Sequence, residues 1–237
     1  MNLQSIIYID DDNFCRTLAE FILEDAEIEV VGLASESECL AWLAEHSADC
    51  VLTDVNLGGE SGVDIAKKLA ELYPDLPVIL VTSHRENSTP LENLSENIRG
   101  VINKPFNTDT FVTTIAQMIL GKSAPVASHD YLNDEIDALR QNYIASLKQD
   151  ISSFEAMLLR IDALEAMPRE YLEEIRDFSH RVSGTSGIYG LSEMCDIAFT
   201  IEEKAVSLLA SHAVMNAEIK HFFRCKFLDL IASIQTL

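Results

Sequence analysis

The chain has 237 residues, 48% of them hydrophobic and 24% charged, which is enough for two ordinary domains with full cores. Its formal net charge is −22. So acidic a chain lacks the basic patch that nucleic-acid-binding proteins usually carry, and we expect no nucleic acid partner.

The cysteines and the apolar runs bear on the compartment. The five cysteines include no C-x-x-C pair, and their odd number favours buried thiols in a reducing compartment. No run approaches the roughly 18 apolar residues that a membrane helix needs, so we expect no membrane insertion. The first residues also lack the basic and apolar regions of a signal peptide. We therefore predict a cytoplasmic protein.

Short apolar runs rich in β-branched residues alternate with amphipathic segments through the first 120 residues. The predicted strands are Ser5–Ile9, Ile28–Leu33, Cys50–Thr53, Pro77–Val81 and Arg99–Ile102. The predicted helices are Asn13–Asp25, with Asn13 as its N-cap, Ser37–His46, Gly62–Tyr73, Leu91–Asn97 and Thr108–Leu120. This alternation predicts an α/β doubly wound, five-stranded parallel sheet.

Polar side chains stand where four of these strands end. They are Asp10, Asp11, Asp54, Thr82 and Lys104. Ligands of doubly wound sheets bind at the carboxyl ends of the strands, so we expect these side chains to meet at one edge. Clustered carboxylates suit a hard cation such as Mg²⁺, and a lysine and a hydroxyl suit a phosphoryl group.

This set of residues resembles the receiver domain of two-component response regulators, over residues 1–121. The resemblance implies a flavodoxin-like fold in which Asp54 accepts a phosphoryl group from a phosphohistidine. It also implies that Asp10, Asp11 and Asp54 hold Mg²⁺ together with the main-chain carbonyl of Asn56.

The same resemblance implies that Lys104 binds the phosphoryl group and that Thr82 follows it in a conformational change. Two positions depart from the family. Gly58 lies in a loop where receivers usually carry Met-Pro, so we expect this loop to be more mobile. Val101 stands where receivers usually carry the Tyr or Phe that swings inward with the threonine, so phosphorylation would either be signalled differently here or serve transfer more than switching.

The C-terminal half is expected to be helical. Residues 122–129 are small and polar and are predicted to be a linker. Apolar residues then recur every three or four positions through residues 130–237, which predicts an all-α bundle of four long helices. The first of them is either one helix or two with a break near residues 148–152.

The stretch Phe178–Gly187 carries one histidine and two glycines within a helical pattern. Each glycine costs about 0.5–1 kcal/mol relative to alanine, so something should require them. His180, Ser183, Gly184 and Gly187 share one helix face. We expect the imidazole to project from a face without bulky side chains, where a second protein could approach and a ring nitrogen could accept a phosphoryl group.

This stretch resembles the histidine-phosphotransfer (HPt) domain, whose signature runs His-x-Leu-Lys/Ala-Gly-Ser/Ala. A further small residue and a Gly follow on the same helix. His180, Val182, Gly184, Ser186 and Gly187 fit this pattern, whereas Ser183 stands where many members carry Lys or Ala. The resemblance implies that His180 carries a phosphoryl group. The plainer interpretation is a surface histidine on a glycine-weakened helix.

Together these patterns predict a phosphorelay protein, a carrier rather than an enzyme, that uses Asp54 and His180. Its expected partners are a sensor histidine kinase, another receiver or an HPt protein. One alternative is a response regulator whose helical domain is an interaction or dimerisation output, with His180 not phosphorylated. Another is a phosphohydrolase with Asp54 as nucleophile, although Asn56 stands where such an enzyme would need a general acid.

Overall fold

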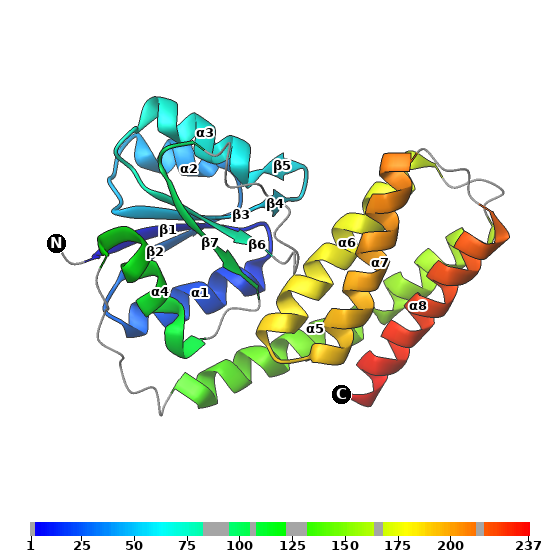
Figure 1. The fold of residues 1–237 in the computed structure, drawn as a ribbon. Helices are drawn as coiled ribbons and strands as arrows, with labels where there is room; N and C mark the ends of the chain where they lie inside the picture. Colours follow the sequence, from blue (N-terminus) through cyan, green and yellow to red (C-terminus); the bar gives the residue numbers. More distant parts are fainter. Residues whose placement is uncertain (1–2, 83–94, 105–107, 122–131, 164–167, 212–215) are drawn as a thin grey trace. The chain divides into compact units, whose positions relative to one another are not determined.

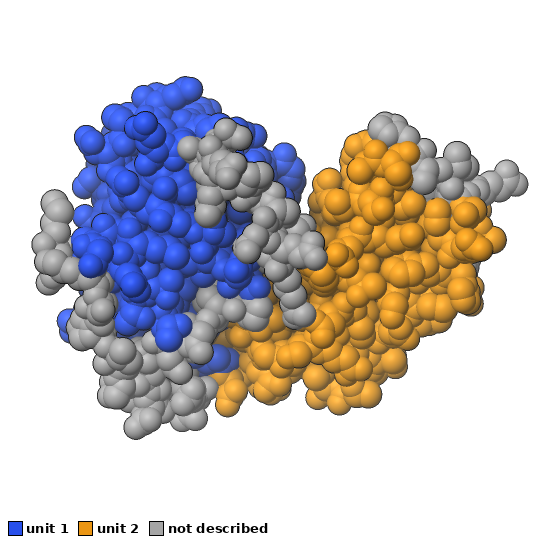
Figure 2. Space-filling view, in the orientation of Figure 1, with its two compact units in different colours: residues 1–136 blue, residues 137–237 orange. Residues whose placement is uncertain are grey.

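The computed structural model describes residues 3–82, 95–104, 108–121, 132–163, 168–211 and 216–237. The chain forms two compact units, residues 1–136 and 137–237, which Figure 2 distinguishes by colour. The division falls within a helix, a few residues after the predicted linker 122–129, which lies outside the described residues.

Unit 1 is built on a parallel sheet of five strands in the order β2-β1-β3-β6-β7. These strands are β1 (Ser5–Ile9), β2 (Glu29–Leu33), β3 (Cys50–Asp54), β6 (Val78–Thr82) and β7 (Ile98–Asn103). Strands β1, β3 and β6 are buried throughout or nearly so, as expected for strands covered by helices on both faces. The predicted doubly wound sheet is thus confirmed.

Four described helices cover the sheet (Figure 1). α1 (Asn13–Asp25) and α4 (Thr108–Leu120) lie on one face, and α2 (Glu36–Leu43) and α3 (Gly62–Leu72) lie on the other. Because side chains alternate along a strand, Ile7 and Ile9 of β1 pack in the core beneath α2 and α3. The intervening Tyr8 therefore points to the face covered by α1 and α4.

Two local predictions need correction, and a third stays a prediction. The N-cap of α1 is Asp12, not Asn13, because the Asp12 carboxylate accepts the backbone N–H of Phe14 at 2.8 Å. The loop expected to be more mobile contains a two-stranded antiparallel hairpin of β4 (Asn56–Leu57) and β5 (Glu60–Ser61), and its mobility stays a prediction. Of the helix predicted over residues 91–97, residues 91–94 lie outside the described part, and residues 95–97 are not helical.

Unit 2 consists, in its described part, of α5 (Leu132–Ala163), α6 (Arg169–Ile188), α7 (Ser192–Ser211) and α8 (Ala217–Thr236). α5 begins within unit 1 by sequence and continues without the break considered near residue 150. An aromatic series joins three helices, since the ring of Phe178 lies 4.8 Å from Phe154 and 6.1 Å from Phe227, centroid to centroid.

We expect Gly62→Ala to lower the free energy of unfolding of unit 1 by about 1–3 kcal/mol. A Cβ at this first residue of α3 would lie 2.0 Å from the carbonyl oxygen of Asp54, so the backbone beside the carboxylate would have to move. Urea unfolding followed by the fluorescence of Trp42, the single tryptophan, measures this in the full chain.

Gly100→Ala is the matched control for this change. Its Cβ would meet the sulfur of Met118 at 2.6 Å, and that flexible side chain can turn away. An equal loss of stability in the two variants would contradict the explanation by backbone crowding.

Candidate functional site

The carboxyl ends of β1 and β3 bring three carboxylates together. Oxygen atoms of Asp10, Asp11 and Asp54 all lie within 4.8 Å of one another. The strand register explains this, because Ile9 pairs with Thr53 and each strand then runs on into its aspartate. The predicted meeting of these side chains at one sheet edge is what the structure shows.

Lys104, directly after β7, brings a positive charge into this cluster. Its Nζ lies 2.7 Å from Oδ2 of Asp10 and 3.2 Å from Oδ1 of Asp54, and all three side chains are buried. Burial lowers the pKa of Lys104, but the charges of Asp10 and Asp54 outweigh it and hold the pKa well above its usual value. The ammonium is therefore permanently charged and bridges the two carboxylates.

Thr82 and Asn56 frame the same edge. Thr82 is the last residue of β6. Its carbonyl accepts the backbone N–H of Lys104 at 2.6 Å, and this bond holds the ends of β6 and β7 together. Asn56 lies in β4, two residues beyond Asp54, with its side chain exposed. The role of its carbonyl as a metal ligand stays a prediction.

Gly58 lies in the β4–β5 hairpin, close to the carboxylate cluster. It adopts φ +49°, and a Cβ there would lie 2.9 Å from Oδ2 of Asp11. A residue without a side chain therefore allows the β4–β5 hairpin to pass closely over the carboxylate cluster.

Asp10 is held by three hydrogen-bond donors. Its Oδ1 accepts the backbone N–H of Asp12 at 3.0 Å, and its Oδ2 accepts both Lys104 Nζ and the hydroxyl of Tyr8, the latter at 3.1 Å. Burial raises the pKa of Asp10 to about 6; Lys104 opposes the shift and Asp54 adds to it. Tyr8 was not predicted as a site residue.

The donor set fits Mg²⁺. It consists of carboxylate oxygens, which are the hard ligands that this ion prefers. Three acids against one lysine also leave an excess of negative charge in a buried place, and a divalent cation at Asp10, Asp11 and Asp54 would offset that excess.

A second group of polar residues surrounds His180 in unit 2. Nδ1 of His180 on α6 lies 2.8 Å from Oε1 of Glu202 on α7. The hydroxyl of Ser183 lies within donating distance of two acceptors, the other oxygen of Glu202 at 3.3 Å and the carbonyl of His180 at 3.1 Å. His180 and Glu202 side chains are 11% and 4% exposed.

The prediction of a cleared helix face around His180 was wrong. Ser183 and Gly184 are buried, and α6 packs closely along α7. The small residues thus serve the contact between two helices of the same unit rather than leaving open room for a partner, and the imidazole lies at the margin of that contact.

Glu202 could have been found from the sequence. It falls on the buried face of α7 between Ala198 and Ala205, at positions three to four residues apart where every other member is apolar. A carboxylate in such a row needs a partner, and a histidine on a neighbouring helix is a suitable one.

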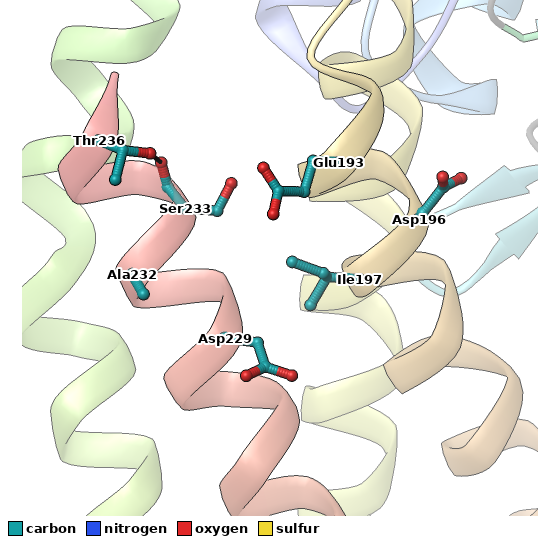
Figure 3. Close-up of a pocket in the computed structure, with 7 residues that line it drawn as sticks. All are labelled: Glu193, Asp196, Ile197, Asp229, Ala232, Ser233 and Thr236. Atoms are coloured by element: carbon teal, nitrogen blue, oxygen red, sulfur yellow. Dashed lines mark hydrogen bonds between the residues drawn. The ribbon is translucent and has the colours of Figure 1, made fainter.

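The described part of unit 2 also has a shallow pocket between α7 and α8 (Figure 3). Its polar lining includes Glu193, Asp196 and Asp229. None of the residues predicted to carry chemistry lines it, so we assign it no part in the site.

The comparisons with known proteins concern unit 1. Residues 6–116 match the response regulator receiver domain family. These residues are a receiver domain. The match covers the predicted sheet and carries Asp10, Asp11, Asp54, Thr82 and Lys104.

Curated relatives of the receiver domain are regulators. The chain is 35% identical over 108 residues to the C4-dicarboxylate transport transcriptional regulatory protein DctD of Rhizobium meliloti, covering 46% of this chain and 24% of DctD. It is 31% identical over 119 residues to the response regulator GacA of Pseudomonas aeruginosa, covering 49% and 56%. The chain thus spans between about a quarter and a half of the relatives' lengths.

A solved receiver domain from Clostridium thermocellum is 28% identical, with a TM-score of 0.45 and coverage of 49% of this chain and 94% of that one. The family match ends at residue 116, and these comparisons give the phosphohistidine assignment no support. Within the described helices, none is both long enough and apolar enough to cross a bilayer.

The raised pKa of Asp10 predicts a pH-dependent response to Mg²⁺. In the metal-free protein, the stability that protonated Asp10 contributes is fully present below about pH 4 and is lost as the pH rises through about 6. Mg²⁺ competes with that proton. We expect Mg²⁺ to raise the melting temperature at pH 7.5 and to lose this effect as the pH falls below 6.

Thermal unfolding with and without Mg²⁺, from pH 4.5 to 8, measures this effect. The reference is the same buffer with a chelator and no divalent cation. A Mg²⁺ effect of the same size at pH 5 and pH 7.5 would show that Asp10 is not in competition with the metal.

Proposed function

We propose that this chain is a two-component response regulator in which Asp54 accepts the phosphoryl group. The observation that carries the proposal is the pairing of Asp54 with Lys104, beside two further carboxylates, at the carboxyl edge of a receiver sheet. The protein would be a signal carrier rather than an enzyme with a substrate of its own.

The arrangement divides the work among a few groups. Mg²⁺ held by Asp10, Asp11 and Asp54 would screen the negative charge of an incoming phosphoryl group. A carboxylate oxygen of Asp54 would attack phosphorus, and the bond from phosphorus to the donor's histidine nitrogen would break. Lys104 Nζ would then pair with a phosphoryl oxygen, and the Thr82 hydroxyl would donate to another.

We further propose that the helices of unit 2 are the output that responds to this event. Support comes from the relatives, since DctD is a transcriptional regulatory protein and GacA a response regulator by name. The NtrC relative of Salmonella typhimurium is a DNA-binding regulator. Here residues 121–237 carry 18 acidic against 11 basic residues, which favours a protein partner over nucleic acid.

One observation favours a second candidate, phosphotransfer through His180. A proton on Nδ1 held by Glu202 places the lone pair of the neutral ring on Nε2, the nitrogen that would attack phosphorus. The negative charge of Glu202 would also stabilise the cationic ring that forms. Partners under this candidate would be a receiver domain or a sensor histidine kinase, and this chain's own Asp54 is one such receiver.

We expect Asp54→Ala to abolish labelling of the full chain by radioactive acetyl phosphate and Mg²⁺, because the attacking oxygen is lost. Asp64→Ala, which removes an exposed carboxylate at the first turn of α3, is the control and should label as the wild type does. Equal labelling of wild type and Asp54→Ala would refute Asp54 as the acceptor.

The two candidates differ in where label goes next. An acyl phosphate is cleaved by hydroxylamine, whereas a phosphohistidine resists it and is lost in acid. If His180 takes part, the wild type should accumulate hydroxylamine-resistant label that His180→Gln lacks and that Glu202→Gln lowers about tenfold or more. His221→Gln, a change at an exposed histidine of α8, should keep it.

Absence of hydroxylamine-resistant label in the wild type, with normal labelling of Asp54, would reject transfer from this chain's Asp54 to His180 and favour unit 2 as an output. Retention of that label in His180→Gln would reject His180 as the acceptor.

A further inference from the structure

The hydroxyl of Tyr8 is a buried polar group at the receiver site that the proposed chemistry does not use. Tyr8 lies in the middle of β1, is fully buried, and donates to Oδ2 of Asp10 at 3.1 Å. Residues 8 and 10 point to the same side of the strand, so the phenol can reach the carboxylate along that side. Its surroundings include Cys15 of α1 and the charges of Asp10 and Lys104.

The two oxygens of Asp10 are held unequally. Oδ2 accepts two donors, Tyr8 Oη and Lys104 Nζ, whereas Oδ1 accepts the backbone N–H of Asp12. A carboxylate oxygen offers about two acceptor positions, so Oδ2 is full and the remaining position within the described residues is on Oδ1. That leaves Oδ1 as the oxygen of Asp10 that can face a cation.

Lys104 has two tasks that compete. It pairs with Asp10 at 2.7 Å and with Asp54 at 3.2 Å, and a phosphoryl group on Asp54 would draw its ammonium toward the new oxygens. When Lys104 moves toward the phosphoryl oxygens, Oδ2 of Asp10 loses its strongest donor. A buried carboxylate oxygen left without a donor is costly.

We propose that Tyr8 is a positioning residue that keeps Asp10 satisfied and in place while Lys104 turns to the phosphoryl group. The phenol is a neutral donor fixed by the core, so it remains on Oδ2 when the ammonium leaves. This inference rests on Asp54 being the phosphoacceptor. It concerns one step only, the change from the metal-bound site to the site that also holds the phosphoryl group.

Tyr8→Phe tests the inference in the full chain, with two affinities measured by calorimetry. One is for Mg²⁺ alone, and the other is for beryllium trifluoride at saturating Mg²⁺, where it mimics a phosphoryl group on Asp54. We expect the affinity for beryllium trifluoride to fall about tenfold, the worth of one hydrogen bond to a charged group. The affinity for Mg²⁺ should change by less than about threefold, because Lys104 still holds Oδ2 in that state.

Tyr73→Phe is the matched control, since it removes a phenol hydroxyl from the opposite side of the same unit, where Tyr73 packs against the core of α2 and α3. Both affinities should equal those of the wild type. Thermal unfolding of each variant confirms that the measurements are made on folded protein.

Two results would overturn the inference: an unchanged affinity for beryllium trifluoride in Tyr8→Phe, or a parallel loss of both affinities, which a general structural role would produce. Failure of the proposed function looks different. In that case the wild type binds no beryllium trifluoride, or Asp54→Ala binds it as the wild type does, and the inference falls with it.

Discussion

The receiver site depends on one buried cation. Lys104 lies between Asp10 and Asp54 with almost no exposure, and each of the three ions would be prohibitively costly in that place without the others. Because Lys104 follows β7 while the two acids end β1 and β3, the ion pairs fix three strand ends at one edge. With Asp11 the site holds three carboxylates against one ammonium, and one divalent cation would offset the remaining two negative charges.

Much of unit 1 could be predicted because parallel strands buried on both faces must be apolar almost to their last residue. The polar residue that ends each run is then conspicuous, and the strand pairing carries Asp10 and Asp54 to one place. Tyr8 was not predicted as a site residue because it lies inside the apolar run, where an aromatic ring is an ordinary core residue. Its hydroxyl is the part that contacts Asp10, and a pattern of hydrophobic residues does not register one oxygen atom.

The environment of His180 shows the opposite limitation. Small residues on a helix face are compatible with an open surface and equally with a close helix contact, and the sequence of α6 alone does not distinguish them. The deciding information is on α7, where Glu202 interrupts a buried apolar row. Contacts between helices distant in sequence are set by tertiary packing, so the partner of the imidazole could be suspected from α7 but not assigned.

The two sites differ in what they require for charge balance. The receiver site holds three carboxylates against one ammonium, so a phosphoryl group arriving there would need a metal to offset the negative charge. The site on α6 holds one carboxylate against one imidazole, which a single proton balances.

Val101 adds a further constraint, since it packs against the core beneath α2 and α3 and is too short to follow Thr82 as an aromatic side chain would. Under the proposed function, such a receiver would rely on the movement of Lys104 and Thr82 themselves, and the donors that hold Asp10 during that movement would matter more than in a site with an aromatic switch.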